Sequence, residues 1–236
     1  LRCATLLETL DGGSLSFGDL AVATDAGSGA VYAKGDVPKQ TRSRFGLVFQ
    51  NYNLFPHYTV MKNITDAPIR VLKRPREQAE ARAHELIAQM GLTGNENKVP
   101  CELSGGQQRR VAFAGVLAME PEVLVLDEPM AGLDPAACSD FLELIDRLHH
   151  GGLTVVMVSH SMDDLANCCD RIVVMNEGTV FAEGTPAQVF AHADELKSIG
   201  LGVPAAQRMA LALAKAGVPL RFDGLYTVCL LYTSPS

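Results

Sequence analysis

Apolar positions follow two different spacings in the second half of the chain, and the spacing changes where one element ends and the next begins. Helical spacing, with apolar residues three or four apart, covers about 106–119 and 135–150. A short continuous apolar run follows each of these helices, at 123–126 and 154–158. Such runs are typical of strands buried on both faces of a parallel sheet, because helices then cover both sides. We therefore expect an α/β fold built on a parallel sheet.

Shorter patterned segments occupy the rest of the chain. A helix is expected over 75–90, with Gly91 as its stop, since glycine readily adopts the left-handed conformation that ends helices. Its inward side chains would be Leu86, Ile87 and Met90. The other expected elements are edge strands and turns in the Gly-, Ser-, Asp- and Thr-rich residues 1–44, a strand at 45–49, a short helix capped by Thr59 or Asn63, a hairpin of 171–175 and 179–182 around the turn 176–178, and helices at 186–192 and 204–216.

Composition and charge narrow the class of protein. Hydrophobic residues make up 47% of the 236 residues and charged residues 20%, as in ordinary globular proteins. The net charge of −7 offers no broad basic surface for a phosphate backbone, so nucleic acid is not expected as a partner. No apolar run approaches the roughly 18 to 20 residues that span a bilayer. The six cysteines form no CxxC pair, which suits reduced cytosolic thiols.

The segment LSGGQ, at 103–107, lies at the start of the helix expected at 106–119. Ser104 is placed to cap that helix, and Gly105 and Gly106 would let a ligand approach the backbone closely. Free N–H groups and the positive end of the helix dipole favour an anion such as phosphate at this position. The alternative is an ordinary Ser-Gly-Gly helix start without a ligand.

Two adjacent carboxylates, Asp127 and Glu128, follow the apolar strand at 123–126. Open α/β sheets place their ligands at the carboxyl ends of strands. In phosphoryl transfer one such carboxylate could hold Mg²⁺ while the next polarises the attacking water. The alternative is that Asp-Glu-Pro only opens a turn toward the helix at 135–150.

Gln50 and His160 also follow expected strands, so the His160 imidazole should emerge on the same edge of the sheet as Asp127 and Glu128. A single glutamine or histidine after a strand is more often structural than functional. The order of the motifs makes these residues informative as a set. The order is Gln50, LSGGQ at 103–107, the strand ending in Asp127 and Glu128, AGLD at 131–134, and His160. This order and spacing resemble the ABC-transporter ATPase family over residues 1–192.

The resemblance implies a P-loop NTPase-like fold with a helical subdomain at about 54–105, and it implies ATP and Mg²⁺ as cofactors. It also implies a role for each matching residue. Glu128 would be the catalytic base and His160 would contact the γ-phosphate; Ser104, Gly105, Gly106 and Gln107 would contact ATP held by the opposite protomer; Asp134 would act across the dimer; Asp127 would organise Mg²⁺; and Gln50 would sense Mg²⁺ and water and face the membrane subunit.

The function implied by the resemblance is that of an ATP-binding subunit that couples ATP hydrolysis to solute import. Its partners would be transmembrane permease subunits and a second ATPase subunit, at the cytoplasmic face of the membrane. Two ATP molecules would lie between head-to-tail protomers, so that closing the pair couples nucleotide binding to motion of the membrane subunits.

The two halves of the chain resemble different importers. Residues 45–110 are similar to polar amino-acid importer ATPases. From residue 114 onward the chain resembles the ATPase of energy-coupling-factor transporters for vitamins, cobalt or nickel, and this half includes SHSM at 159–162 and an extension at 193–228. Residues 229–236 resemble a translated sequencing adapter and are expected to be a non-native tail.

The phosphate-binding run GxxGxGK[ST] of the family is absent from the sequence, and Gly-Ser-Gly-Ala at 27–30 lacks the lysine that would follow. We therefore expect a chain without the first strand and the P-loop of the family, inactive and poorly folded when expressed alone. The alternatives are a chimeric fragment joined near LSGGQ, a genuine intermediate subfamily, and a non-catalytic partner that lends LSGGQ to an intact ATPase. A soluble ABC ATPase of DNA repair or translation is the alternative from another class, but no coiled-coil insertion, tandem cassette or basic surface supports it.

Overall fold

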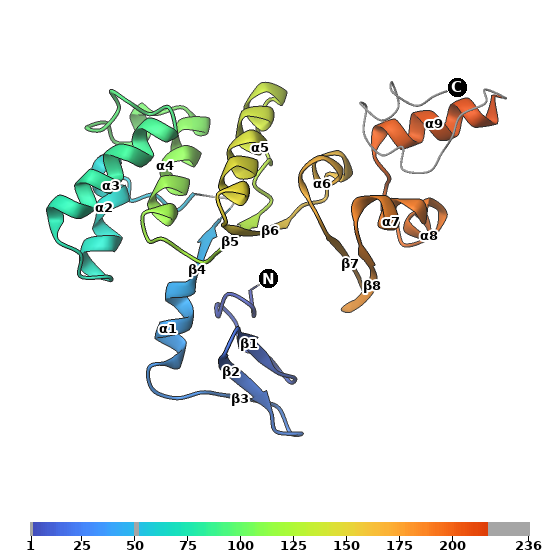
Figure 1. Ribbon diagram of the computed structural model, residues 1–236, viewed down its shortest axis with the longest axis horizontal. Helices are drawn as coiled ribbons and strands as arrows, with labels where there is room; N and C mark the ends of the chain where they lie inside the picture. Colours follow the sequence, from blue (N-terminus) through green and yellow to red (C-terminus); the bar gives the residue numbers. More distant parts are fainter. Residues whose placement is uncertain (1, 50–51, 217–236) are drawn as a thin grey trace. The chain divides into compact units, whose positions relative to one another are not determined.

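The computed structural model describes residues 2–49 and 52–216, and the chain divides into two compact units, Leu1–Val158 and Ser159–Ser236. Helices and strands are mixed in both units (Figure 1). The expected α/β class, with a parallel sheet and packed helices, is confirmed. The expected non-native tail at 229–236 lies outside the described residues.

The first unit opens with a small antiparallel sheet in which three strands follow one another in order. The turn between the first two strands contains Gly18 at φ 57°, a conformation that glycine adopts without a Cβ clash. The strands and turns expected in residues 1–44 are therefore present, and a helix follows them. The elements are β1 (Leu15–Phe17), β2 (Leu20–Asp25), β3 (Ala30–Tyr32) and α1 (Val37–Arg44).

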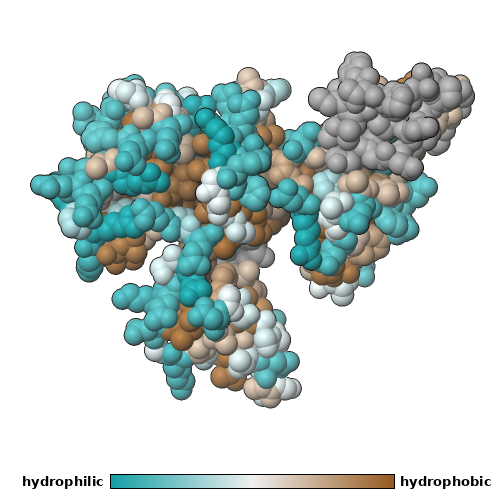
Figure 2. All heavy atoms as spheres, viewed as in Figure 1, coloured by the Kyte–Doolittle hydropathy of each residue, from teal (hydrophilic) through white to brown (hydrophobic). Residues whose placement is uncertain are grey.

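Three helices pack against one another in the middle of the first unit, and their outward surface is largely hydrophilic over α2 and α3 (Figure 2). The hydroxyl of Thr59 caps α2 by accepting from the amide of Lys62 at 3.2 Å, as expected. Helix α3 ends where Gly91 adopts φ 64° and the amide of Leu92 donates to the Ile87 carbonyl at 2.8 Å. The bounds are α2 (Val60–Arg70), α3 (Arg76–Gln89), the 3₁₀ turn η1 (Pro100–Glu102) and α4 (Gly105–Leu117).

A parallel sheet in the order β4-β5-β6 lies beside these helices in the first unit. Leu124 and Leu126 on the central strand are fully buried in the core that α4 and α5 share. There the rings of Phe113 and Phe141 meet edge to face with 5.0 Å between their centroids, a favourable aromatic geometry. The elements are β4 (Phe45–Val48), β5 (Val123–Asp127), α5 (Pro135–His150) and β6 (Thr154–Val158).

Among the described residues of the first unit, only one face of β6 is covered, so the expectation that both faces of 154–158 are buried is wrong. Val155 and Met157 pack against the core, whereas Val156 and Val158 are 46% and 41% exposed. The reason is that β6 is the edge strand of the described sheet, and the core helices lie on the face that carries Val155 and Met157.

The second unit is built on the expected hairpin. Its turn places Glu177 at φ 47° and Gly178 at φ 79°, the pair of left-handed residues that tight hairpin turns require. Phe190 and Leu196 are among the most deeply buried side chains of this unit. The elements are α6 (Met162–Cys168), β7 (Ile172–Asn176), β8 (Thr179–Gly184), α7 (Pro186–Ala191), α8 (Ala193–Ser198) and α9 (Ala205–Lys215), of which α6 and α8 were not expected from the pattern.

Candidate active site

The LSGGQ segment forms the start of α4 as a reciprocal capping box. The hydroxyl of Ser104 accepts from the amide of Gln107 at 3.2 Å, and the side-chain oxygen of Gln107 accepts from the amide of Ser104 at 3.0 Å. This arrangement satisfies two donors that a helix start otherwise leaves without partners. The serine and the glutamine of the segment therefore have a structural role in the chain itself.

The two glycines of the segment have no such structural explanation. A Cβ added at Gly105 or at Gly106 would meet nothing within 4 Å, and neither residue has a positive φ. The internal packing and the backbone conformation would therefore both accept alanine. What glycine provides here is open space beside the first N–H groups of a helix, where the dipole favours negative charge. Such a cradle is the kind of helix start that favours a phosphate group.

The carboxylates Asp127 and Glu128 lie where β5 ends, as expected. Asp127 pairs with Val158 of β6, and the amide of Glu128 donates to the Val158 carbonyl at 3.0 Å. At Glu128 the chain turns out of the sheet with φ 47°, a left-handed conformation that non-glycine residues adopt infrequently. Both side chains are half-buried. Carboxylate oxygens at this position suit a hard cation such as Mg²⁺.

Asp134 caps helix α5. Its side chain is the acceptor for the amide of Ala137 at 2.9 Å, and Pro135 occupies the first turn, where a missing N–H costs nothing. The residue is exposed, so its carboxylate remains accessible from outside the chain. The cap accounts for the aspartate structurally, and its predicted role across a dimer stays a prediction.

Two predicted site residues do not belong to the described part of the first unit. Gln50 lies outside the described residues. His160 is exposed and belongs to the second unit. It lies between two serines, and the amide of Ser161 donates to the hydroxyl of Ser159 at 3.1 Å. The expected shared edge of His160 with Asp127 joins two separate units and stays a prediction.

Arg109 is the feature of this region that the sequence reasoning missed. It lies on the second turn of α4 and is only 4% exposed. Its guanidinium donates to the carbonyl oxygens of Pro129 and of Ala131, the latter at 2.7 Å, and to the hydroxyl of Tyr52 at 2.9 Å. The available signal was its helical spacing, because Arg109 precedes the buried Phe113 by four residues and so lies on the inward face.

These bonds connect the helix that begins with LSGGQ to the loop after Glu128, which includes AGLD, within the first unit. Tyr52, which the same guanidinium contacts, lies two residues after Gln50.

Over residues 2–49 and 52–216, no group of three or more His, Cys, Asp or Glu side chains could hold a metal ion. In the same ranges no helix is long and apolar enough to cross a bilayer.

Comparisons with known proteins identify the family. A profile of the ABC transporter family matches residues 5–131. The L-cystine transport system ATP-binding protein TcyN of Escherichia coli is 40% identical over 195 residues, which cover 83% of this chain and 77% of that protein. The energy-coupling factor transporter ATP-binding protein EcfA2 of Streptococcus sanguinis is 40% identical over 227 residues, 91% of this chain and 77% of that protein.

A solved structure is similar as well. It is a dimeric ATP-binding cassette in a post-hydrolysis state with bound ADP and Pi, and it matches with a TM-score of 0.66 at 27% identity, covering 78% of each chain. The capped glycine cradle, the paired carboxylates at a strand end and these matches lead to one conclusion. The chain belongs to the ABC transporter family of ATP-binding, ATP-hydrolysing proteins.

Proposed function

We propose that this chain is the ATP-binding subunit of an energy-coupling-factor importer, in which ATP hydrolysis drives uptake of a vitamin, cobalt or nickel. The observation that carries the ATP site is the open glycine pair at the start of α4, where Gly105 and Gly106 leave room for a phosphate. The extent of the alignments supports an energy-coupling-factor importer over an amino-acid importer. The energy-coupling-factor relative aligns with 91% of this chain and the cystine-transport relative with 83%, so more of the chain has a counterpart in the former.

Each predicted site residue keeps its role in this proposal. Mg²⁺ commonly binds proteins through one or two carboxylates, several waters and the phosphates of a substrate, and the carboxylate of Asp127 suits that mode. When bound, Mg²⁺ would neutralise charge that develops on the β- and γ-phosphates. Ser104, Gly105, Gly106 and Gln107 would bind phosphates of ATP on the opposite subunit, Asp127 and Gln50 would hold Mg²⁺, Glu128 would accept a proton from the attacking water, His160 would contact the γ-phosphate, and Asp134 would act across the dimer.

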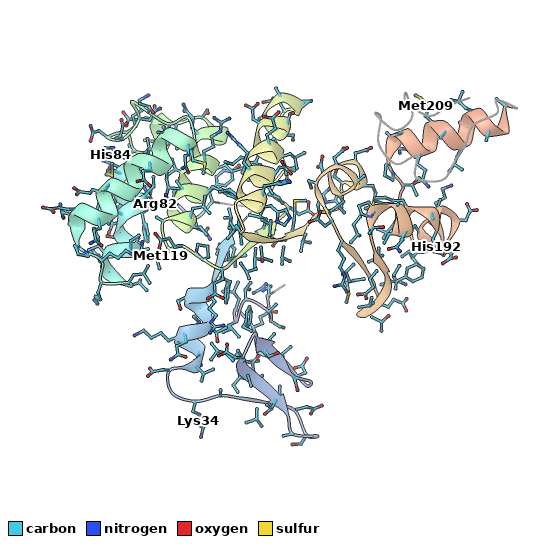
Figure 3. The ribbon with its side chains drawn as sticks, in the orientation of Figure 1. Lys34, Arg82, His84, Met119, His192 and Met209 are labelled. Atoms are coloured by element: carbon cyan, nitrogen blue, oxygen red, sulfur yellow. The ribbon has the colours of Figure 1, made fainter. Side chains whose placement is uncertain are left out.

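The proposed partners are a second ATPase subunit and transmembrane permease subunits, with the chain peripheral to the cytoplasmic face of the membrane. Helix α9 offers an apolar contact for a second ATPase. Ala206 and Ala210 are buried, whereas Met209, which Figure 3 labels on the same helix, is 57% exposed. Exposed methionines are adaptable apolar contacts, which favours a partner at residues 209–213.

A polar amino-acid importer is the second candidate. It is favoured by the cystine-transport relative, whose identity of 40% equals that of the energy-coupling-factor relative. The two candidates differ in the membrane subunits that the chain must bind, so the choice is open to a direct binding experiment.

The experiment is co-expression of the full chain with two alternative sets of partners. One set is the membrane subunits and second ATPase subunit of an energy-coupling-factor transporter, and the other is that of a polar amino-acid importer. We expect co-purification in detergent and ATP hydrolysis only with the first set. Assembly with the second set alone would establish the second candidate, and failure to assemble with either would refute both.

Two substitutions then separate the two ATP sites of such a complex. Ser104→Asp keeps a capping acceptor but adds negative charge beside a phosphate, so we expect ATP turnover to fall by about a hundredfold. Glu128→Gln tests the site that contains the carboxylates of this chain. The same carboxylate-to-amide change at the exposed Glu143 of α5 is the control. If ATP turnover is lost with Ser104→Asp but not with Glu128→Gln, the chain contributes only its LSGGQ face to an ATP site on the partner subunit.

A further inference from the structure

The buried guanidinium of Arg109 has an unusual set of partners. Within the described residues it is bonded to two carbonyl oxygens and a phenol oxygen, and to no carboxylate. Arginine stays charged in proteins, and a buried charge is tolerated only when hydrogen bonds replace its water. The two carbonyls, of Pro129 and Ala131, flank the buried Met130 in the loop after Glu128. The loop therefore stabilises the buried charge of Arg109, and Arg109 in turn holds the loop in position.

The loop itself contains little regular structure to hold it. It consists of two successive turns, in which the amide of Ala131 donates to the Glu128 carbonyl and the amide of Leu133 donates to the Met130 carbonyl, each at 3.1 Å. The first turn begins at the left-handed Glu128 and the second includes Gly132 at φ 75°. Hydrogen bonds to a charged donor are stronger than these neutral ones. Arg109 is thus a charged tether between this loop and helix α4.

The third partner extends the tether to another loop. The hydroxyl of Tyr52 accepts from Arg109, and its ring centroid lies 5.1 Å from the guanidinium carbon, within the range of a cation–π contact. Tyr52 and Asn53 both have left-handed backbones, with φ of 57° and 48°. Consecutive left-handed residues other than glycine persist only where surrounding contacts fix them.

We propose that Arg109 is a positioning residue that holds the loop from Glu128 to Asp134 and the loop that begins at Tyr52 in one fixed arrangement against α4. The consequence for ATP hydrolysis rests on the proposed function, because it requires Glu128 and Asp134 to act there. The anchoring itself does not. Arg109 would set where the carboxylate of Glu128 and the cap of α5 lie, without contacting the nucleotide.

Amide hydrogen exchange of the full chain tests the anchoring directly. In Arg109→Gln, we expect the amides of Ala131 and Leu133 to exchange about tenfold to a hundredfold faster, because the tether to a charged donor is lost. The amide of Leu126, which is fully buried on the central strand β5, is the reference for global opening and should not change. Equal acceleration at all three amides, or no acceleration, would overturn the proposal.

Matched variants separate anchoring from general loss of packing. Arg109→Lys keeps the charge but reaches fewer acceptors, so its effect should fall between that of the parent and that of Arg109→Gln. Tyr52→Phe keeps the ring and removes one acceptor, which should loosen the loop by less than Arg109→Gln. Arg110→Gln is the control, since its neighbouring guanidinium contacts Asp140 instead of the loop. An Arg110→Gln variant that accelerates Ala131 as much as Arg109→Gln would also overturn the proposal.

ATP turnover in the reconstituted complex provides the second measurement. Loss of positioning should lower kcat with KM changed little, because Arg109 does not contact ATP. A complex that never hydrolyses ATP would count against the proposed function alone, and the exchange measurement would still decide the anchoring. Faster exchange of the loop with unchanged kcat would confirm the anchoring and refute its importance for hydrolysis.

Discussion

Gly106→Ala is the substitution that best separates a residue kept for folding from one kept for a ligand. Gly106 is the second residue of α4, its φ is not positive, and an added Cβ would have nothing within 4 Å. Alanine in place of a helical glycine stabilises by about 0.5–1 kcal/mol, mainly because the unfolded chain loses freedom. For a chain of this length that corresponds to a rise of about 1–4 °C in Tm. The folded protein should therefore become more stable.

The function should change in the opposite direction. The new methyl group would occupy the space in which a phosphate approaches the first N–H groups of α4, and a displacement of about 1 Å at a reacting group can cost a hundredfold in rate. We expect ATP hydrolysis by the reconstituted complex to fall by about a hundredfold. Thermal unfolding of the full chain and steady-state ATP turnover of the complex measure the two effects independently.

Gly115→Ala supplies a matched control in the same helix. Its Cβ would lie 3.4 Å from the Asn63 carbonyl, an ordinary contact, so the same gain in stability is expected with no loss of turnover. The reasoning is refuted if Gly106→Ala lowers Tm, since the glycine would then serve the fold. It is equally refuted if turnover survives, since the open space would then serve no ligand.

Substitutions at three further positions probe the cap, the core and a surface ion pair, each by urea unfolding. Ser104→Ala removes the cap of α4 and should cost about 0.5–2 kcal/mol, whereas Ser104→Thr should restore most of it. Phe113→Ala leaves a cavity in the core shared by α4 and α5 and should cost about 3–5 kcal/mol; a smaller cost would mean that the site collapses. The hydrogen bond from Arg74 lowers the pKa of Glu120, so this stabilising contribution is present above the ordinary pKa of glutamate and is lost as pH falls through the lowered value. Glu120→Gln should therefore cost at most about 1 kcal/mol at pH 7 and nothing in acid, because the pair is partly exposed.

Much of the architecture was predictable because its signals are local. Helix α5 spans 135–150 as expected, since Asp134 and Pro135 together form a recognisable helix start. The end of α3 was predictable from Gly91 for the same reason. Helix α1 was not, because only Thr41 of its eight residues is buried and its mostly polar sequence gives no apolar period.

The candidate site likewise contains features that the local sequence predicted and features that it could not predict. The cap at Ser104 and the carboxylates at the end of β5 follow from local rules, and the structure places both as expected. Arg109 was not predictable as a site residue, because its partners lie 20 to 57 positions away in sequence and only the fold brings them together. The burial of β6 was misjudged for a related reason. A continuous apolar run says that a strand can be covered on both faces, but not whether the neighbouring elements cover it.

The uncovered face of β6 has a consequence for how the protein behaves in solution. In the described sheet β6 is an edge strand of sequence TVVMV, without charge, proline or glycine, and with Val156 and Val158 exposed. These are the features of a segment that pairs with a second copy of itself. Samples of this chain should therefore become turbid at high concentration and on warming. A single lysine at position 156 should delay that onset, since charged side chains are how natural sheet edges resist aggregation.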